Sequence, residues 1–294
     1  MTATEPAPAK VNLALHVVGR REDGFHLLHT LCVFTELADL VTAAPARRDR
    51  LTVSGPFGAD LPSGRSNLVL RALEKFRARF PDHLPDGIEI HLEKHLPVAA
   101  GLGGGSADAA AVLRILARMS QAPVAEADLF ALAATLGADV PMCLYGRPLI
   151  ARGIGEMLEP FPALPRLPIL LVNAGLPLAT PKVFSALIKR EHAPLPALPS
   201  KSDPAELLEW MRLTRNDLEP AALSLVPEIG SVLGLLRAEG ALIARMSGSG
   251  ATCFGIFEHQ EAAERTRQAI AQKHPYWFAC ATETSASTGE LVHV

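Results

Sequence analysis

Several features that mark whole classes of protein are missing from this sequence of 294 residues. Lys and Arg number 28 against 31 Asp and Glu, so the chain lacks the positive charge of a dedicated nucleic-acid binder. Its four cysteines are scattered and form neither a C-x-x-C redox motif nor a zinc pattern. The ten histidines show no tetrahedral ligand spacing either. We therefore expect free thiols and no structural metal.

Long apolar runs are also missing. The most apolar stretch, residues 167–180, is broken by proline, glycine and asparagine and is shorter than the ~20 residues of a membrane-spanning helix. The first ten residues do not show the basic segment followed by an apolar one that marks a secretory signal. The expectation is a cytoplasmic protein that does not bind membranes.

The composition indicates a folded chain with a sizeable core. Hydrophobic residues make up 49% and charged residues 20%, and the 22 Gly and 24 Pro indicate many turns. The length fits one large or two ordinary domains. A segment rich in Gly and Pro at 152–168 is the candidate boundary. We predict domains over 1–160 and 161–294.

Hydrophobic periodicity predicts a mixture of strands and helices that do not alternate strictly, which favours an α+β fold. A β-hairpin is expected near the start, a helix capped by Ser66 or Asn67 follows, and the helix over 126–136 is expected to end at Gly137. The proline-rich segment 192–204 is expected to be a surface loop. The predicted strands cover residues 11–17, 26–37, 88–92, 169–172, 241–246, 252–257 and 277–282, and a last helix covers 260–273.

Three consecutive glycines, Gly103 to Gly105, stand between a predicted strand and a predicted helix. The free N–H groups at such a helix start can bind an anion, and phosphate is the natural ligand, although the same glycines could form a purely structural turn. The chain has no G-K-[ST], G-x-S-x-G, H-R-D or D-F-G motif, and Ser106 stands where a dinucleotide fingerprint needs Gly or Ala. P-loop NTPases, Rossmann dehydrogenases, α/β-hydrolases and protein kinases are all disfavoured.

Two charged residues lie in apolar surroundings. Asp139 follows a predicted helix and has Ala138, Val140 and Met142 around it, so its carboxylate must be paired, hydrogen-bonded or functional. Lys10 precedes the first apolar strand. Taken alone, Asp139 could satisfy backbone N–H groups at a helix end and Lys10 could be a solvated charge. Together with a phosphate loop, the two suggest a reaction centre.

Five motifs in combination resemble the family of galactokinase, homoserine, mevalonate and phosphomevalonate kinases, the GHMP kinases. They lie at residues 8–13, 24–26, 96–110, 137–141 and 246–252. The P-A-K-x-N-L motif, the stretch 21–26 and the G-A-D-V-P motif resemble in particular the branch whose acceptor is a cytidyl diphosphate ester of methylerythritol. The similarity runs over nearly the whole chain.

This resemblance implies a two-domain α+β GHMP kinase fold, in which ATP and a small-molecule acceptor meet in the cleft between the domains and Mg²⁺ assists. Asp139 would take the proton of the acceptor hydroxyl, with Lys10 as the cation beside it. Phe25, His26 and Phe184 would hold the cytosine ring, and Asn12 and Thr180 would lie near the acceptor. The ATP phosphates would be bound by Pro97, Ala99, Ala100, Gly101, Leu102, Gly103, Gly104, Gly105 and Ser106.

Two residues depart from the family pattern, and other functions stay open. Phe25 stands where Tyr is expected, and Ala107 where a second Ser is common, so one hydroxyl contact is lost at each place. The acceptor could instead be mevalonate, homoserine or a sugar. A nucleotide-binding regulator without turnover is a further alternative, and a redox enzyme is the least favoured. We expect a monomer or a weak homodimer.

Overall fold

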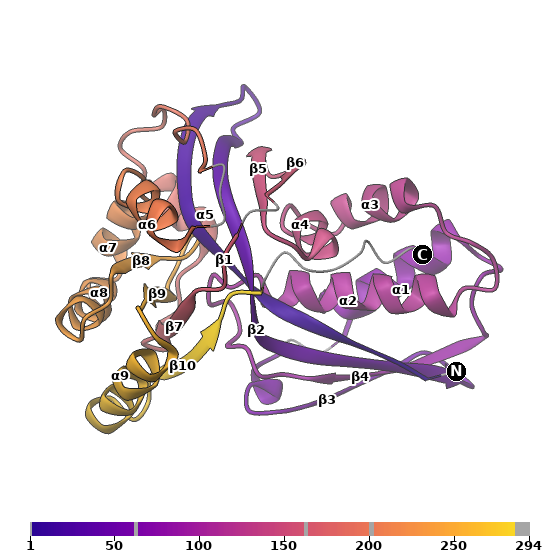
Figure 1. Cartoon of the computed structure of the whole chain (residues 1–294). Coiled ribbons are helices and arrows are strands. Elements are labelled where there is room, and N and C mark those ends of the chain that lie inside the picture. Colours follow the sequence, from indigo (N-terminus) through magenta and orange to yellow (C-terminus); the bar gives the residue numbers. More distant parts are fainter. Residues whose placement is uncertain (1, 62–63, 162–163, 200–202, 286–294) are drawn as a thin grey trace.

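The computed structural model describes residues 2–61, 64–161, 164–199 and 203–285, and it confirms the α+β class (Figure 1). The elements of the first half are β1 (Ala3–Arg20), β2 (His26–Ala46), β3 (Arg50–Ser54), α1 (Leu68–Arg79), β4 (Gly87–Glu93), α2 (Gly104–Met119), α3 (Glu126–Ala134), α4 (Val140–Tyr145), β5 (Leu149–Gly153) and β6 (Met157–Pro160), with short 3-10 turns at Gly58–Asp60 and Gly64–Ser66. Across the described residues, no helix combines the length and apolar character needed to cross a bilayer.

The elements of the second half surround a smaller sheet. They are β7 (Pro168–Asn173), α5 (Thr180–Ser185), α6 (Pro204–Arg212), α7 (Glu219–Leu225), α8 (Glu228–Ala238), β8 (Ile243–Met246), β9 (Cys253–Ile256), α9 (Gln260–Lys273) and β10 (Phe278–Glu283). The four strands are antiparallel in the order β10-β7-β9-β8. The segment 192–199 forms no regular structure, as its prolines predict.

The first sheet has the order β3-β4-β2-β5-β6, and β1 pairs with β2 in a hairpin that is longer at both ends than predicted. Helices α1 and α2 pack together beside this sheet, and their apolar faces join its buried residues in one core. The β1–β2 register shifts between Pro8 and Lys10 and again between Asn12 and Ala14. Such bulges turn side chains away from the regular alternation, and here they flank Lys10, expected at the reaction centre, and Asn12, expected near the acceptor.

Strand β1 connects the two halves. Leu15 donates its backbone N–H to the Arg215 carbonyl (2.9 Å) and accepts from the Asp217 N–H (2.8 Å). A second core contains Val11 and Leu13 of β1 together with residues of β7 and β9. The predicted division at 160/161 falls in the segment between the end of β6 and the start of β7 and remains a prediction.

Two details differ from the expectation. Helix α3 ends at Ala134 with Thr135 as its C-cap, whose hydroxyl donates to the Leu132 carbonyl at 2.8 Å, so Gly137 is not the cap. Asp139 occupies the N-cap position of α4, a short helix that periodicity did not reveal. Asn67 caps α1, since its Oδ1 accepts from the Val69 N–H at 2.9 Å.

Candidate active site

The glycine loop approaches its neighbours too closely for side chains. Gly101 and Gly103 have φ of 77° and 65°, in the region that favours glycine. A Cβ at Gly101 would lie 2.5 Å from the Gly250 carbonyl oxygen, and a Cβ at Gly104 would lie 3.1 Å from Lys94 Nζ. Gly103 is the N-cap of α2, so the first N–H groups of that helix point out of the loop. This is the cradle expected around a phosphate.

Lys10 and Asp139 converge as predicted. Lys10 Nζ lies 3.3 Å from Asp139 Oδ2 and donates a hydrogen bond to Asn12 Oδ1 at 3.0 Å. The Lys10 backbone N–H donates to the Leu102 carbonyl at 2.8 Å, which ties β1 to the glycine loop. The Lys10 side chain is 5% exposed and that of Asp139 is 40% exposed. The carboxylate can therefore reach a ligand while the ammonium is fixed behind it.

The surroundings keep Lys10 charged. Burial by itself would lower the pKa of Lys10, but the carboxylate of Asp139 opposes this, and the pKa is raised above its ordinary value. Burial raises the pKa of the nearby thiols of Cys32 and Cys143, so both are neutral at neutral pH. Lys10 thus supplies a permanent positive charge that faces Asp139.

Asn12 is oriented by the strand beside it. Its Nδ2 donates to Thr30 Oγ1 at 2.8 Å and to Cys32 Sγ at 3.1 Å, while the Thr30 hydroxyl donates to the Ala14 carbonyl. These bonds leave Asn12 Oδ1 facing Lys10 as an acceptor. The network fixes the direction in which the Lys10 ammonium can point.

Two cavities meet at this pair. The larger is about 710 Å³ and the smaller about 480 Å³. The residues that line both are Lys10, Ser106, Asp139, Thr180, Pro181, Gly248 and Ser249. Two ligands could therefore lie in separate spaces with their reacting ends together.

The smaller cavity contains the glycine loop. Of the residues predicted to bind ATP, those that line it are Pro97, Ala99, Ala100, Gly101, Gly103, Gly104, Gly105 and Ser106. Leu102 does not line it, because its side chain is buried in the core that joins the halves. The loop is held from the other side by the 247–250 turn, where Ser247 Oγ donates to the Gly101 carbonyl at 3.3 Å.

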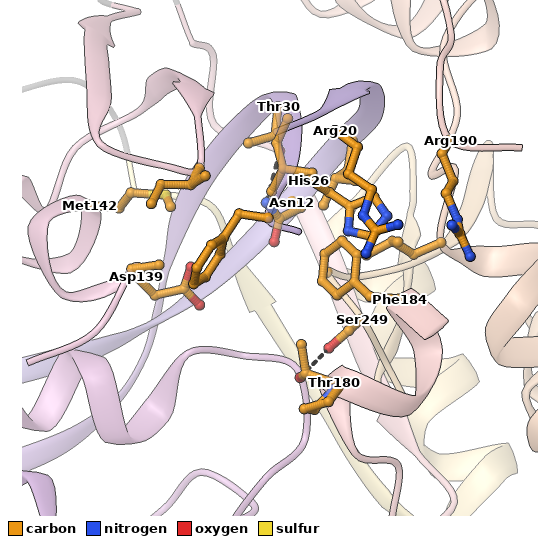
Figure 2. A pocket seen from close by; sticks show the side chains of 18 of the residues that line it. Asn12, Arg20, His26, Thr30, Asp139, Met142, Thr180, Phe184, Arg190 and Ser249 are labelled. Carbon is orange, nitrogen blue, oxygen red and sulfur yellow. Dashed lines mark hydrogen bonds between the residues drawn. The ribbon is translucent and has the colours of Figure 1, made fainter. Parts of the chain in front are cut away.

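The larger cavity is lined by every residue predicted to hold the acceptor (Figure 2). The rings of His26 and Phe184 stack with centroids 5.0 Å apart and planes 28° from parallel. Phe25 is 58% exposed, so its ring is accessible to a ligand in the cavity. The hydroxyls of Thr180 and Ser249 lie 2.7 Å apart. The cavity thus has flat apolar surfaces at one end and the Lys10–Asp139 pair at the other.

Two arginines of this cavity were missed in the sequence. Arg20 and Arg190 line it beside His26, and Arg20 is positioned by a bond from its Nε to the Gly24 carbonyl at 3.1 Å. Burial, with the charges of these two arginines, lowers the pKa of His26, so its imidazole is neutral at pH 7. Nothing in the sequence around Arg20 points to a cavity, and only the pairing of Arg20 with His26 in the hairpin reveals its place.

A second buried lysine was also missed. Lys94, just after β4, contacts the carboxylates of Asp39 and Asp108, and its side chain is 1% exposed. Asp39 lies in an apolar strand and Asp108 in an alanine-rich helix. The argument from apolar surroundings that singled out Asp139 would have found both.

Comparisons with known proteins agree with this geometry. Sequence profiles of the GHMP kinases N terminal domain and of the GHMP kinases C terminal domain match residues 67–147 and 194–275. A 4-diphosphocytidyl-2-C-methyl-D-erythritol kinase of Chelativorans sp. is 56% identical over 98% of this chain and 98% of the relative. The one of Brucella melitensis is 53% identical over 94% of this chain and 93% of the relative.

The chain belongs to the GHMP kinase family. A crystal structure of 4-(cytidine 5'-diphospho)-2C-methyl-D-erythritol kinase aligns with a TM-score of 0.79 at 39% identity, covering 97% of this chain and 100% of that chain. A homoserine kinase from Cytophaga hutchinsonii aligns with a TM-score of 0.69 at 19% identity, covering 97% and 95%, which shows the shared fold alone. Membership in this family confirms the resemblance and makes the chain an ATP-dependent small-molecule kinase.

Proposed function

We propose that this GHMP kinase transfers the γ-phosphoryl group of ATP to the 2-hydroxyl of 4-diphosphocytidyl-2-C-methyl-D-erythritol, a step of the non-mevalonate route to isoprenoid precursors. The products are the 2-phosphate and ADP. The observation that carries the proposal is the 3.3 Å contact between Lys10 and Asp139 at the place where two cavities meet. The relatives of 56% and 53% identity bear the name of this kinase.

The smaller cavity suits the triphosphate. Its glycines allow the positive φ angles that the loop needs at Gly101 and Gly103, and the N–H groups at the start of α2 offer hydrogen bonds to phosphate oxygens. In this proposal the loop from Pro97 to Ser106 holds ATP. Mg²⁺, when bound, would neutralise charge on the phosphate oxygens. Among the described residues, no group of three or more His, Cys, Asp or Glu is placed so that it could hold a metal ion.

The larger cavity suits the cytidyl acceptor. Phe25 offers an aromatic face for the cytosine ring, and the neutral imidazole of His26 offers hydrogen bonds. Arg20 and Arg190 supply positive charge for the diphosphate, while Asn12 and Thr180 lie near the end that reacts. The absence of a phenol hydroxyl at Phe25 leaves stacking unchanged.

Catalysis in this arrangement is mostly positioning. Asp139 orients the acceptor hydroxyl and takes its proton, and Lys10 stabilises negative charge at the acceptor or on the transferring group. Well-oriented reactants can save roughly 7–11 kcal/mol of barrier. A fixed charge contact adds on the order of 3–4 kcal/mol.

The test is the product. Mass spectrometry of a reaction with Mg-ATP and the cytidyl acceptor should show a monophosphorylated acceptor. Parallel reactions with mevalonate, homoserine and galactose should release far less ADP. Nucleotide binding without ADP release from any acceptor would instead favour a regulator.

The cellular setting belongs to the same proposal. We infer a cytoplasmic enzyme that works as a monomer or weak homodimer on a small molecule, without nucleic-acid or membrane partners. The near balance of 28 basic and 31 acidic residues supports the absence of a nucleic-acid partner.

A further inference from the structure

The buried cluster of Asp39, Lys94 and Asp108 has no part in the mechanism above, yet it lies at the wall of the smaller cavity. Both Lys94 and Asp108 line that cavity, and Lys94 Nζ lies 3.1 Å from the position that a Cβ at Gly104 would take. Lys94 Nζ donates to Asp108 Oδ2 at 2.7 Å and also contacts Asp39 Oδ2. The inference that follows rests on ATP binding in this cavity.

The two carboxyl groups are very unequal in their hydrogen bonds. Asp39 accepts from Lys94 and, through its Oδ1, from the backbone N–H groups of His95 at 2.6 Å and Leu96 at 2.8 Å. Asp108 accepts from Lys94, and its buried Oδ1 has no hydrogen-bond donor among the described residues. Asp39 is thus stabilised as a carboxylate, and Asp108 is not.

The carboxyl groups of Asp39 and Asp108 contact the same ammonium group, that of Lys94, which holds the two acids next to each other. Two carboxylates are both acceptors, so a bond between them needs a proton. Asp39 accepts from Lys94 and from two backbone N–H groups, whereas Asp108 accepts from Lys94 alone, so the proton belongs to Asp108. With it, the cluster is neutral; without it, the cluster carries one net negative charge against the site of the triphosphate.

We propose that Asp108 is a positioning residue for ATP. Its carboxyl group holds a proton that it shares with Asp39, so that the charge of Lys94 supports the phosphate loop. Where the free enzyme has lost this proton, nucleotide binding draws a proton from solvent back onto Asp108. Phosphates add negative charge beside the cluster and so favour the protonated form. By linkage, nucleotide affinity falls as pH rises through the range in which Asp108 of the free enzyme loses its proton.

The charges and the burial around Asp108 place the loss of its proton near neutral pH. Burial raises the pKa of Asp108 to about 7, since the opposing charge of Lys94 is itself countered by that of Asp39. Other charged groups near the cavity are Lys10 and Asp139 across it, and the exposed pair of His95 and Glu93 beside Lys94. Helix α1 contributes Leu68 to the lining of the smaller cavity, and its N-cap residue Asn67 lines the cavity too.

The first experiment uses the unaltered protein. Calorimetric titration with Mg-ADP, without acceptor, is repeated at pH 7.5 in buffers of different ionisation enthalpy, and the slope gives the protons taken up per nucleotide. We expect a net uptake of about 0.3 to 0.8 proton, because an acid with a pKa of about 7 is already roughly one quarter protonated at pH 7.5. Tight binding with no proton exchange between pH 6.5 and 8.5 would overturn the inference. A complete lack of nucleotide binding would instead count against the proposed function.

The second experiment separates this role from a merely structural one. Asp108→Asn mimics the protonated acid, so it should bind Mg-ADP with nearly the same affinity from pH 6.5 to 8.5, take up no proton, and bind more tightly than the unaltered protein at pH 8.5. Weaker binding at every pH would mean that Asp108 only supports the fold. If this variant does not fold, the titration of the unaltered protein still decides.

Two matched variants test whether a neighbouring group takes up the proton in place of Asp108. Glu93→Gln removes a carboxylate at the end of β4 beside Lys94, and His95→Gln removes the imidazole that contacts it. Both should keep the proton uptake of the unaltered protein. Loss of the uptake in His95→Gln would assign the proton to that ring and contradict our proposal.

Discussion

The two cavities are built from different materials. The smaller is largely backbone: glycines whose φ values and close contacts exclude side chains, and helix N–H groups. The larger is side chains: aromatic rings, two arginines and polar groups from β1, β2 and α5. Backbone suits a ligand that every family member shares, whereas side chains can be exchanged as the acceptor changes. Substitutions in the smaller cavity should therefore act through steric clash and backbone strain, and substitutions in the larger cavity should act through the loss of side-chain contacts.

The largest expected effect lies where the cavities meet. Asp139→Asn keeps the shape but removes the proton acceptor, so kcat should fall by at least ~100-fold. The Kd for Mg-ATP should change little, because the phosphate loop is untouched. Steady-state kinetics and equilibrium nucleotide binding measure both. Asp128→Asn, in α3 and outside the lining of both cavities, is the control. Near-normal turnover of Asp139→Asn would remove Asp139 from the mechanism.

The next effect tests the backbone cavity. Gly101→Ala places a methyl group 2.5 Å from the Gly250 carbonyl at a φ of 77°. The loop must shift, and kcat/KM for ATP should fall on the order of 30-fold, the size expected of such strain. Gly234→Ala in α8 is the matched control, because its Cβ meets no atom within 4 Å. Equal kinetics for the two variants would mean that the loop does not need this close contact.

A smaller effect tests the side-chain cavity. Phe25→Ala should raise the KM for the cytidyl acceptor about tenfold, because base–aromatic stacking contributes about 1–3 kcal/mol. The KM for ATP should stay the same. Tyr276→Ala removes an aromatic ring that is 95% exposed in the second half and serves as the control. A similar rise in both KM values would place the cytosine site elsewhere.

The smallest effect concerns charge. Replacing Arg20 and Arg190 by Gln should raise the acceptor KM about threefold at low salt and less at high salt, since exposed charges are screened. Arg212→Gln in α6 should change nothing. A KM that is indifferent to both the substitution and the salt would show that these guanidinium groups do not reach the diphosphate.

Local signals predicted much of this architecture. The glycine run, the isolated Lys10 and the periodic helices α1, α2 and α9 are encoded in neighbouring residues, and the structure brings Lys10 to Asp139 as expected. The short helices α5, α6 and α7 were not predicted, because each carries proline in its first turn. Proline is well tolerated there, yet in a sequence it first suggests a loop.

Unlike Asp39 and Asp108, the missed residues Lys94 and Arg20 are placed by contacts between distant parts of the chain. Lys94 meets Asp39 from 55 positions away, and no spacing rule connects them. Arg20 enters the larger cavity only because the hairpin brings it opposite His26. Composition and periodicity describe faces of single elements, whereas these groups are placed by how the elements fold against one another.

Strand β1 fixes the distance between two parts of the larger cavity. It carries Lys10 and Arg20, which both line the larger cavity, and between them it is bonded to the second half at Leu15. The separation of these two residues is thus set by one continuous backbone rather than by a hinge. An acceptor short enough to reach only one of them would gain only part of the binding energy, so molecular length itself becomes a criterion of selection.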